Sequence, residues 1–89
     1  MFEWDEAKSE ATLRSRGFNF ATAARIFENS VLEFDDDRRA YGEKRIAAIG
    51  RAGTNMLFVV YTWRGDARRI ISARLANRKE RNAYREAFG

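Results

Sequence analysis

The chain has 89 residues and a net charge of +4, and its 45% hydrophobic and 34% charged residues are typical of a single globular domain, residues 1–89, with one modest core. The absence of cysteine and histidine excludes disulfides, thiolate metal sites, a thiol nucleophile and acid–base catalysis by imidazole. No apolar run approaches the roughly 20 residues of a membrane span and the acidic N-terminus is not a signal peptide, so we expect a soluble cytoplasmic protein with no cofactor and no membrane partner.

The N-terminal third is predicted to form a short strand followed by two helices. Residues 2–4 alternate apolar and polar side chains, as a strand does. Asp5 is a suitable N-cap for a helix that reaches Arg16, and the glycine that follows is the usual residue after a helix C-terminus. Asn19 can cap a second helix whose apolar residues fall on one face, and residues 29–30 end it.

The rest of the chain is predicted to form a sheet and one more helix. Runs of β-forming residues separated by polar turns predict four strands, at residues 31–35, 41–50, 56–63 and 68–75. The third of these is apolar on both faces, which is typical of a central strand covered on both sides. Asn77 and Glu80 form a capping-box pattern at the start of the last helix. The order of elements predicts an α+β domain, in which a mostly antiparallel β-sheet of four to five strands packs with two N-terminal helices and one C-terminal helix.

Basic side chains gather in the C-terminal half of the chain. Residues 1–37 carry four basic and nine acidic side chains, whereas residues 38–89 carry thirteen basic and four acidic ones. Within residues 68–85, six arginines and one lysine accompany a single acid, Glu80. Arginine presents a planar fork of donors that suits phosphate, so this clustering indicates an anionic partner, with nucleic acid as the first candidate. The alternative interpretation is an arginine-rich solvated surface.

Several short motifs occur along the chain in the order found in a known family. They are FEWDEAK (2–8), RGFNF (16–20), Ala23, Phe27, GEKR (42–45), AIG (48–50), VVYTWRGD (59–66), RIISAR (69–74), Glu80 and Tyr84. Together they resemble the BrnT toxin family, the toxin half of a bacterial type II toxin–antitoxin pair, over nearly the whole chain. The resemblance implies a single BrnT-like toxin domain with a RelE-like fold, which cleaves RNA without a metal and inhibits translation. It also implies a BrnA-like antitoxin that binds the toxin and represses their shared promoter, so that promoter DNA is contacted only through the antitoxin.

The chain departs from the family pattern before its second helix. The family usually has Lys-His-Gly there, whereas this chain has Ser15, Arg16 and Gly17, and Thr12 stands where an asparagine is expected. If the family's histidine takes part in the chemistry, this chain has a permanent cation in place of a titrating group. It would then be a non-catalytic RNA-binding or co-repressor module with impaired nuclease activity, which still binds its antitoxin. If the histidine only contacts phosphate, Arg16 is a tolerable substitute.

Cleavage of RNA without a metal requires a base for the 2′-OH, cations for the charge on the phosphorane and a proton for the departing 5′ oxygen. Arg45, Arg74 and Arg78 are the candidate cations, since strands and a helix start can bring them together. Glu43 is the candidate base, because alternation along its predicted strand puts it on the same face as Arg45. Glu80 is available as well, but its capping-box position favours a structural role.

Other basic and aromatic side chains are candidates for holding the RNA, namely Lys8, Arg16, Arg69, Trp63 and Tyr84. The alternative interpretation is that these are exposed surface cations and core aromatic residues, and it is strongest for Tyr84 on the inner stripe of the last helix. Adjacent carboxylates can hold magnesium, which draws attention to the run Asp35-Asp36-Asp37. Consecutive residues point in different directions, however, so a solvated acidic turn is favoured and no metal site is predicted.

Overall fold

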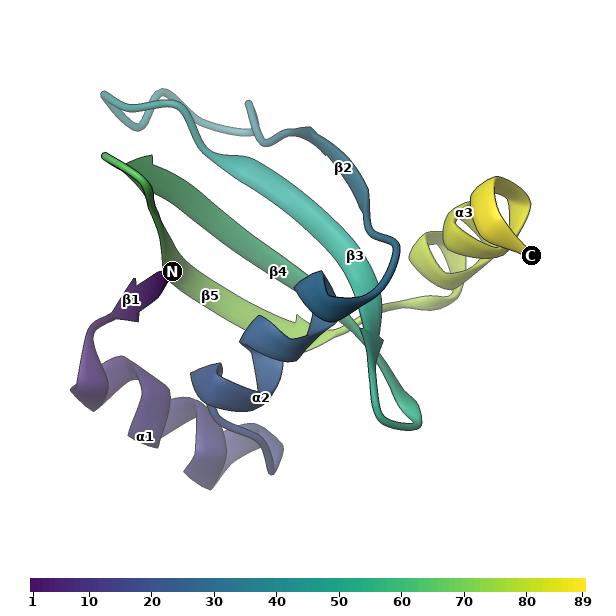
Figure 1. Ribbon diagram of the computed structural model, residues 1–89, viewed down its shortest axis with the longest axis horizontal. Helices are drawn as coiled ribbons and strands as arrows, with labels where there is room; N and C mark the ends of the chain where they lie inside the picture. The colour runs from purple at the N-terminus through teal and green to yellow at the C-terminus, as the bar shows by residue number, and fades with distance from the viewer.

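The computed structural model describes residues 1–89 and contains one five-stranded sheet with helices on both of its faces (Figure 1). Its elements, in chain order, are β1 (Phe2–Trp4), α1 (Glu6–Arg16), α2 (Phe20–Ala24), the 3₁₀ turn η1 (Arg25–Glu28), β2 (Leu32–Asp35), β3 (Ile46–Ala52), β4 (Asn55–Arg64), β5 (Ala67–Leu75) and α3 (Arg78–Phe88). The strand order is β1-β5-β4-β3-β2, and only the β1–β5 pair is parallel. The predicted α+β class with a mostly antiparallel sheet is therefore confirmed. None of the helices combines the length and the apolar character needed to cross a membrane.

Side-chain caps define the helix boundaries, as predicted. A carboxylate oxygen of Asp5 accepts hydrogen bonds from the backbone N–H groups of Ala7 and Lys8, at 2.9 and 3.2 Å. Gly17 follows α1 with a φ of 87°, a left-handed conformation that glycine adopts at little cost. Asn19 caps α2 in the same way as Asp5 caps α1, and η1 continues that helix. Hydrogen bonds between near neighbours therefore determine where these helices begin and end.

The strand predicted at residues 41–50 begins only at Ile46. Gly42 has a φ of 76°, which interrupts an extended strand, and the ring of Tyr41 lies under the guanidinium group of Arg45. Residues 36–45 therefore form a loop between β2 and β3, called the 36–45 loop below. Glu43, which was expected on a strand, lies in this loop.

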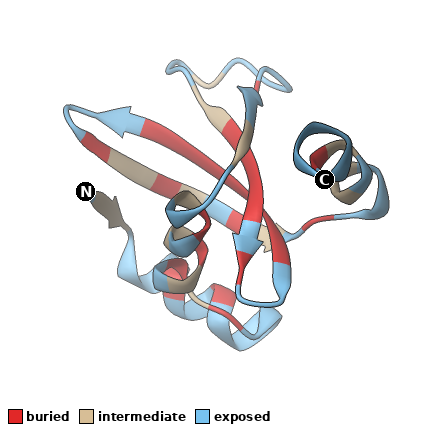
Figure 2. Cartoon of the chain, turned by 45° about the vertical axis from the view of Figure 1, so that its right-hand side comes forward, coloured by how far each residue is buried: buried red, intermediate tan, exposed pale blue.

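The sheet has two faces, and each carries a separate core. The face covered by α1, α2 and η1 is called the α2 face below, and its buried strand residues include Leu57, Val59, Tyr61 and Ile70. The opposite face is called the α3 face, and its buried residues include Ala47, Phe58, Val60 and, from the helix itself, Tyr84. Buried residues gather in the middle of the central strands, whereas most loop residues are exposed (Figure 2). Strand β4 is buried on both faces, as predicted.

The two faces are covered unequally. The two N-terminal helices lie close to each other on the α2 face, whereas α3 lies apart from them, at the far end of the molecule (Figure 1). Among the strands, α3 packs mainly against β3. Part of the α3 face, around Phe58 and β5, is therefore accessible to side chains from the 36–45 loop.

The register of β4 against β5 shifts once, and this shift leaves Ile71 as an extra residue in β5. Beyond such a bulge, the alternation of side chains between the two faces is offset by one residue. Arg74 therefore lies on the α3 face, opposite Phe58, whereas Arg68 lies on the α2 face, opposite Trp63.

Gly50 allows η1 to approach β3 closely. A Cβ atom at this position would lie 2.9 Å from Cβ of Ile26 and 3.0 Å from Cγ1 of Val31, closer than side-chain carbons pack. The missing side chain lets the fully buried Ile26 sit directly on the sheet. This contact completes the core of the α2 face.

Candidate active site

Two arginine side chains lie over the ring of Phe58 on the α3 face. The guanidinium carbon of Arg74 is 4.1 Å from the ring centroid, and that of Arg38 is 5.8 Å from it. Phe58 is only 6% exposed, so its ring is a fixed support. Each such cation–π contact stabilises the cation by about 0.5 to 1 kcal/mol at a partly exposed site. The ring thus brings two cations from distant parts of the chain to one place.

Glu80 holds Arg74 and caps α3 at the same time. Its two carboxylate oxygens accept hydrogen bonds from Arg74, both at 2.8 Å, and Oε1 also accepts one from the backbone N–H of Asn77 at 2.9 Å. Burial raises the pKa of Glu80, but the hydrogen bonds from Arg74 and Asn77 and the charges of Arg74 and Arg38 outweigh it and keep that pKa below its ordinary value. Glu80 is therefore ionised at neutral pH, and the capping role predicted for it is confirmed.

Asp36 holds Arg38 in a similar way, a contact that the sequence analysis did not predict. Nε and Nη2 of Arg38 donate to the two oxygens of Asp36, at 2.6 and 2.9 Å, and these bonds lower the pKa of Asp36 although burial acts against them. Asp36 is 6% exposed, and its backbone N–H donates to the carbonyl of Arg45 at 2.8 Å. The solvated acidic turn expected at residues 35–37 is therefore wrong for Asp36, because the turn folds this carboxylate into the structure and pairs it with Arg38. No group of three or more carboxylates that could hold a metal ion is present.

A chain of contacts continues from Asp36 to Glu43. The Tyr41 hydroxyl donates to Oδ2 of Asp36 at 3.5 Å, and its ring centroid lies 3.9 Å from the guanidinium carbon of Arg45. Nε of Arg45 is 3.4 Å from one carboxylate oxygen of Glu43, and Arg64 approaches the other oxygen at 3.5 Å. Asp36, Tyr41, Glu43 and Arg45, the loop residues in this series of contacts, line an open cavity of about 430 Å³.

These side chains form one connected group, called the arginine network below: Asp36, Arg38, Tyr41, Glu43, Arg45, Phe58, Arg74 and Glu80. It brings together three of the four residues predicted to be catalytic and adds Asp36, Arg38 and Tyr41, which sequence reasoning missed. The fourth, Arg78, lies outside the network and lines a separate open hollow on the surface of α3. The spacing of Asp36 and Arg38 at the end of a strand, which allows a local bidentate pair, is the signal that could have indicated them.

The basic residues predicted to hold RNA are spread over the molecule. Arg69 lies on the α3 face and pairs with Glu3 at 2.9 Å. Lys8 is exposed on α1, on the other side of the sheet. Arg16 donates from Nη1 to the carbonyl of Ala73 at 2.7 Å, at the part of the β5 edge that β1 does not cover. Only Arg69 shares the face of the arginine network, and Arg16 lies at its border.

Of the two aromatic residues predicted to contact RNA, one is exposed and one is buried. Trp63 is 48% exposed, but it lies on the α2 face with its ring centroid 5.9 Å from that of Tyr61. Tyr84 is 4% exposed, and its hydroxyl donates to the carbonyl of Ser30 at 2.9 Å. Tyr84 therefore packs in the core, which leaves no open face of its ring for an RNA base.

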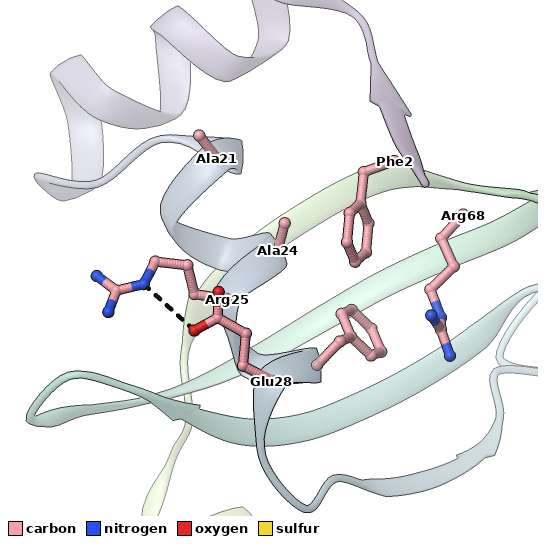
Figure 3. Close-up of a pocket in the computed structure, with 7 residues that line it drawn as sticks. Phe2, Ala21, Ala24, Arg25, Glu28 and Arg68 are labelled. Carbon is pink, nitrogen blue, oxygen red and sulfur yellow. Dashed lines mark ion pairs between the residues drawn. The ribbon is translucent and has the colours of Figure 1, made fainter.

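The α2 face has a hollow of its own beside Arg68 (Figure 3). Its volume is about 350 Å³, its lining is mainly apolar, and Arg25 and Glu28 form an ion pair at 3.8 Å on its rim. The guanidinium carbon of Arg68 lies 4.3 Å from the ring centroid of Phe27 and 4.7 Å from that of Trp63. The buried Nε of Arg68 has no hydrogen-bond partner. Aromatic rings, and not a carboxylate, hold this cation.

Comparisons with known proteins agree at the level of sequence and of structure. Residues 4–80 match the family model described as the ribonuclease toxin BrnT of a type II toxin–antitoxin system, and this range includes the whole arginine network. Among solved structures, the chain is similar to the Brucella abortus ribonuclease toxin BrnT, with a TM-score of 0.67 and 28% sequence identity over 86% of this chain and 96% of that chain. No curated protein sequence matches the chain.

Proposed function

Since the chain belongs to the BrnT family of ribonuclease toxins of type II toxin–antitoxin systems, we propose that it is an endoribonuclease that needs no metal ion. In this proposal it cuts RNA at the arginine network and thereby inhibits translation in the cytoplasm. The observation that best supports this site is the fixed position of Arg74, which is stacked on Phe58 and held by both oxygens of Glu80. A cation with one defined position is suited to stabilise charge that develops only in the transition state.

The arginines of the network supply the charge stabilisation that the reaction needs. Attack of a ribose 2′-OH on the adjacent phosphorus places additional negative charge on the non-bridging oxygens of a five-coordinate phosphorane. Arg74 keeps its Nε–H and one Nη2–H for a ligand, because Glu80 and the carbonyl of Leu75 accept its other hydrogens. Arg45, stacked on the ring of Tyr41, is the second cation in this proposal. Paired N–H donors of this kind match the geometry of phosphate oxygens.

Glu43 is the general base in this proposal, because its arginine contacts are the longest among the three carboxylates of the network. They measure 3.4 and 3.5 Å, whereas Asp36 and Glu80 accept arginine bonds of 2.6 to 2.9 Å. The lowered pKa values of Asp36 and Glu80 also make these two groups weaker bases. Glu43 therefore has the carboxylate that is most open to a 2′-OH.

One observation favours the alternative function, a non-catalytic RNA-binding or co-repressor module. The chain contains no histidine, and Arg16 occupies the position where the resemblance to the family places one. Its guanidinium group donates to the Ala73 carbonyl at the border of the α3 face. A permanent cation there can contact a phosphate but cannot transfer a proton near neutral pH. The protein would then bind RNA and its antitoxin without efficient cleavage.

We further propose that a BrnA-like antitoxin covers the α3 face. Carboxylates of such a partner would pair with the free donors of Arg45 and Arg74 and would exclude RNA from them. The complex would repress its own promoter, with the DNA contacted only by the antitoxin. Hydrogen exchange of the complex should show protection of the 36–45 loop and β5, and protection confined to α1 would contradict this arrangement.

The proposed function is tested by incubating the purified protein with RNA in excess EDTA. We expect cleavage to continue and to leave 2′,3′-cyclic phosphate ends, because the 2′-OH is the nucleophile. Loss of cleavage in EDTA that Mg²⁺ restores would contradict the metal-free reaction. Binding of RNA without cleavage, by a folded protein, would establish the non-catalytic alternative. In bacteria, expression of the chain alone should arrest growth, and co-expression of the adjacent reading frame should relieve the arrest.

A further inference from the structure

We propose that Arg38 and Arg74 form a clamp for the phosphodiester backbone of single-stranded RNA, and that Asp36 is the residue that positions Arg38 in this clamp. The choice of RNA as the ligand rests on the proposed function. The geometry of the clamp does not depend on whether the bound RNA is cut.

The two arginines come from distant parts of the chain and meet over one side chain. Their guanidinium carbons lie 5.8 and 4.1 Å from the centroid of the Phe58 ring, so they are at most about 10 Å apart. The charge of Arg38 also contributes to the lowered pKa of Glu80, the carboxylate that holds Arg74. The two ion pairs are therefore neighbours, and one backbone segment of RNA can reach both cations.

Both arginines keep free donors after their ion pairs have formed. A guanidinium group has five N–H donors. Arg38 gives two of them to Asp36 and keeps three. Arg74 gives two to Glu80 and one to the carbonyl of Leu75, and it keeps two. The clamp can therefore bind phosphate oxygens without releasing the carboxylates that hold it in place.

Asp36 gives Arg38 a defined position even though Arg38 lies at the surface. The side chain of Arg38 is 61% exposed, whereas that of Asp36 is 3% exposed. A mobile surface arginine loses side-chain entropy when it binds a ligand, and an arginine that is already held loses less. The next residue, Arg39, is exposed and has no carboxylate partner. Arg39 therefore provides a matched control, with the same charge in the same loop but without a fixed position.

An exposed aromatic ring beside the clamp favours single-stranded RNA over a free phosphate ion. Phe34 is 46% exposed, and its ring centroid lies 6.1 Å from that of Phe58. Such a ring can stack on any base, because every base has a π-face. A single strand offers an unpaired base next to each phosphate. Phe34 and the clamp together therefore match a nucleotide unit rather than an isolated anion.

The clamp is tested with an RNA that binds but cannot be cut. A short fluorescein-labelled single strand with 2′-O-methyl riboses lacks the attacking hydroxyl, and its fluorescence anisotropy reports its affinity for the full chain. We expect Arg38→Ala to weaken binding about tenfold and Arg39→Ala to weaken it by less than about twofold. Phe34→Ala should weaken the binding of this RNA but not the binding of inorganic phosphate, which has no base to stack.

The positioning role of Asp36 is tested at protein concentrations corrected for the folded fraction, which urea denaturation measures, because partial unfolding alone would also lower the apparent affinity. Asp36→Asn keeps the charge of Arg38 but removes its anchor, so we expect about a threefold loss of affinity at one salt concentration. The slope of log affinity against log salt should stay as in the wild type, because the number of phosphate contacts is the same. Arg38→Ala should instead reduce that slope by about 0.7, the value for one phosphate contact on a single strand.

Equal effects of Arg38→Ala and Arg39→Ala would overturn the clamp, since diffuse positive charge would then explain the binding. Unchanged binding by an Arg38→Ala variant with a native circular dichroism spectrum would overturn it as well. These arginine variants decide the question even if Asp36→Asn does not fold. A wild-type protein that binds through Arg38 but never cuts unmodified RNA would refute the proposed nuclease function and leave the clamp standing.

Discussion

Arg68 and Arg74 lie on opposite faces of the same sheet and show how similar contacts serve different purposes. Each lies over an aromatic ring, at 4.3 Å from the centroid of Phe27 for Arg68 and at 4.1 Å from that of Phe58 for Arg74. Arg68 is surrounded by aromatic rings, and its buried Nε has no hydrogen-bond partner. Arg74 is held from one side by Glu80 and keeps donors free on the other.

The difference between these arginines lies in what remains available to a ligand. Rings on several sides enclose a cation and reduce its contact with solvent and solutes. One ring together with one carboxylate fixes the direction of a cation and leaves part of it open. We infer from this comparison that the α2 face is mainly a packing surface and that the α3 face is a binding surface.

The largest expected difference between the two faces is in the rate of RNA cleavage after replacement of Arg74 or Arg68. Arg74→Ala is expected to slow RNA cleavage about 100- to 1000-fold, since one donor to the transition state contributes on the order of 2.7 to 4 kcal/mol. Arg68→Met removes the cation of the α2 face and should leave the cleavage rate nearly unchanged. Initial rates on one RNA substrate measure both effects, with circular dichroism as the control for folding. A large loss of rate in Arg68→Met would mean that the catalytic face has been assigned incorrectly.

The α2 face should in turn be the more sensitive to a change in packing. Gly50→Ala would place a Cβ atom 2.9 Å from Cβ of Ile26, so η1 must move, and overpacking of this kind typically costs about 1 to 3 kcal/mol of unfolding free energy. Ser72→Ala, at an exposed position of the α3 face, should change that free energy by less than about 0.5 kcal/mol. Urea denaturation measures both variants. Equal stability of Gly50→Ala and the wild type would show that the contact between η1 and β3 is not tight.

Glu80 should show that one carboxylate of the α3 face supports both the fold and the site. Glu80→Ala removes half of a capping box, and we expect it to lower the free energy of unfolding by about 1 kcal/mol. It also releases Arg74, so cleavage should slow, but by less than in Arg74→Ala. Urea denaturation and initial rates test the two effects separately. If Glu80→Ala cleaves as slowly as Arg74→Ala, Glu80 has a direct part in the reaction.

Titrating groups on the two faces should change the free energy of unfolding at opposite ends of the pH scale. Asp36 and Glu80 on the α3 face have lowered pKa values, so they bind protons less tightly in the folded state. They therefore stabilise the fold above their unfolded pKa values, and this contribution is lost as the pH falls through their lower folded values. Glu80→Gln should make the loss of stability in acid shallower, as measured by urea denaturation at a series of pH values.

Tyr61 on the α2 face has a raised pKa, so its contribution to stability is lost at high pH instead of low pH. Burial and the hydrogen bond to Glu33 raise the pKa of Tyr61, because both disfavour its ionised form. Its contribution to stability is complete below its unfolded pKa of about 10 and is lost as the pH rises through the raised folded value. Tyr61→Phe should therefore flatten the alkaline arm of the same profile and leave the acid arm as it is. A change in the acid arm alone would contradict this assignment.

Features that depend on near neighbours could be predicted from the sequence. The caps formed by Asp5, Asn19 and Asn77 act within a few residues of the helix starts, so their positions follow from the local residue types. Alternation and apolar runs predicted where most of the strands lie along the chain, but not their order in the sheet. The strand predicted at residues 41–50 was wrong before Ile46, because Gly42 has a positive φ and Tyr41 contacts Asp36 and Arg45 within the 36–45 loop.

The composition of the site depended on contacts between distant residues, and these were only partly predictable. The chemical types of Glu43, Arg45 and Arg74 predict a shared site, and the three residues do lie in one network. Nothing in the run of three aspartates shows which one is buried, because the burial of Asp36 depends on how the 36–45 loop folds around it through Arg38, Tyr41 and Arg45. Arg38 was not predicted because its support is a ring that lies on a strand further along the chain.

The extra residue in β5 has a consequence for how this protein can vary through evolution. If Ile71 paired regularly with β4, the side chains of the β5 residues before it would point to the opposite faces of the sheet. Arg68 and Arg69 would then exchange faces. Because the extra residue is instead taken up as a bulge, an insertion or deletion at this point changes the length of the strand without inverting it. Homologous chains with a shorter or longer β5 can therefore keep the same division of arginines between their two surfaces, whereas a slip of register without a change in length cannot preserve it.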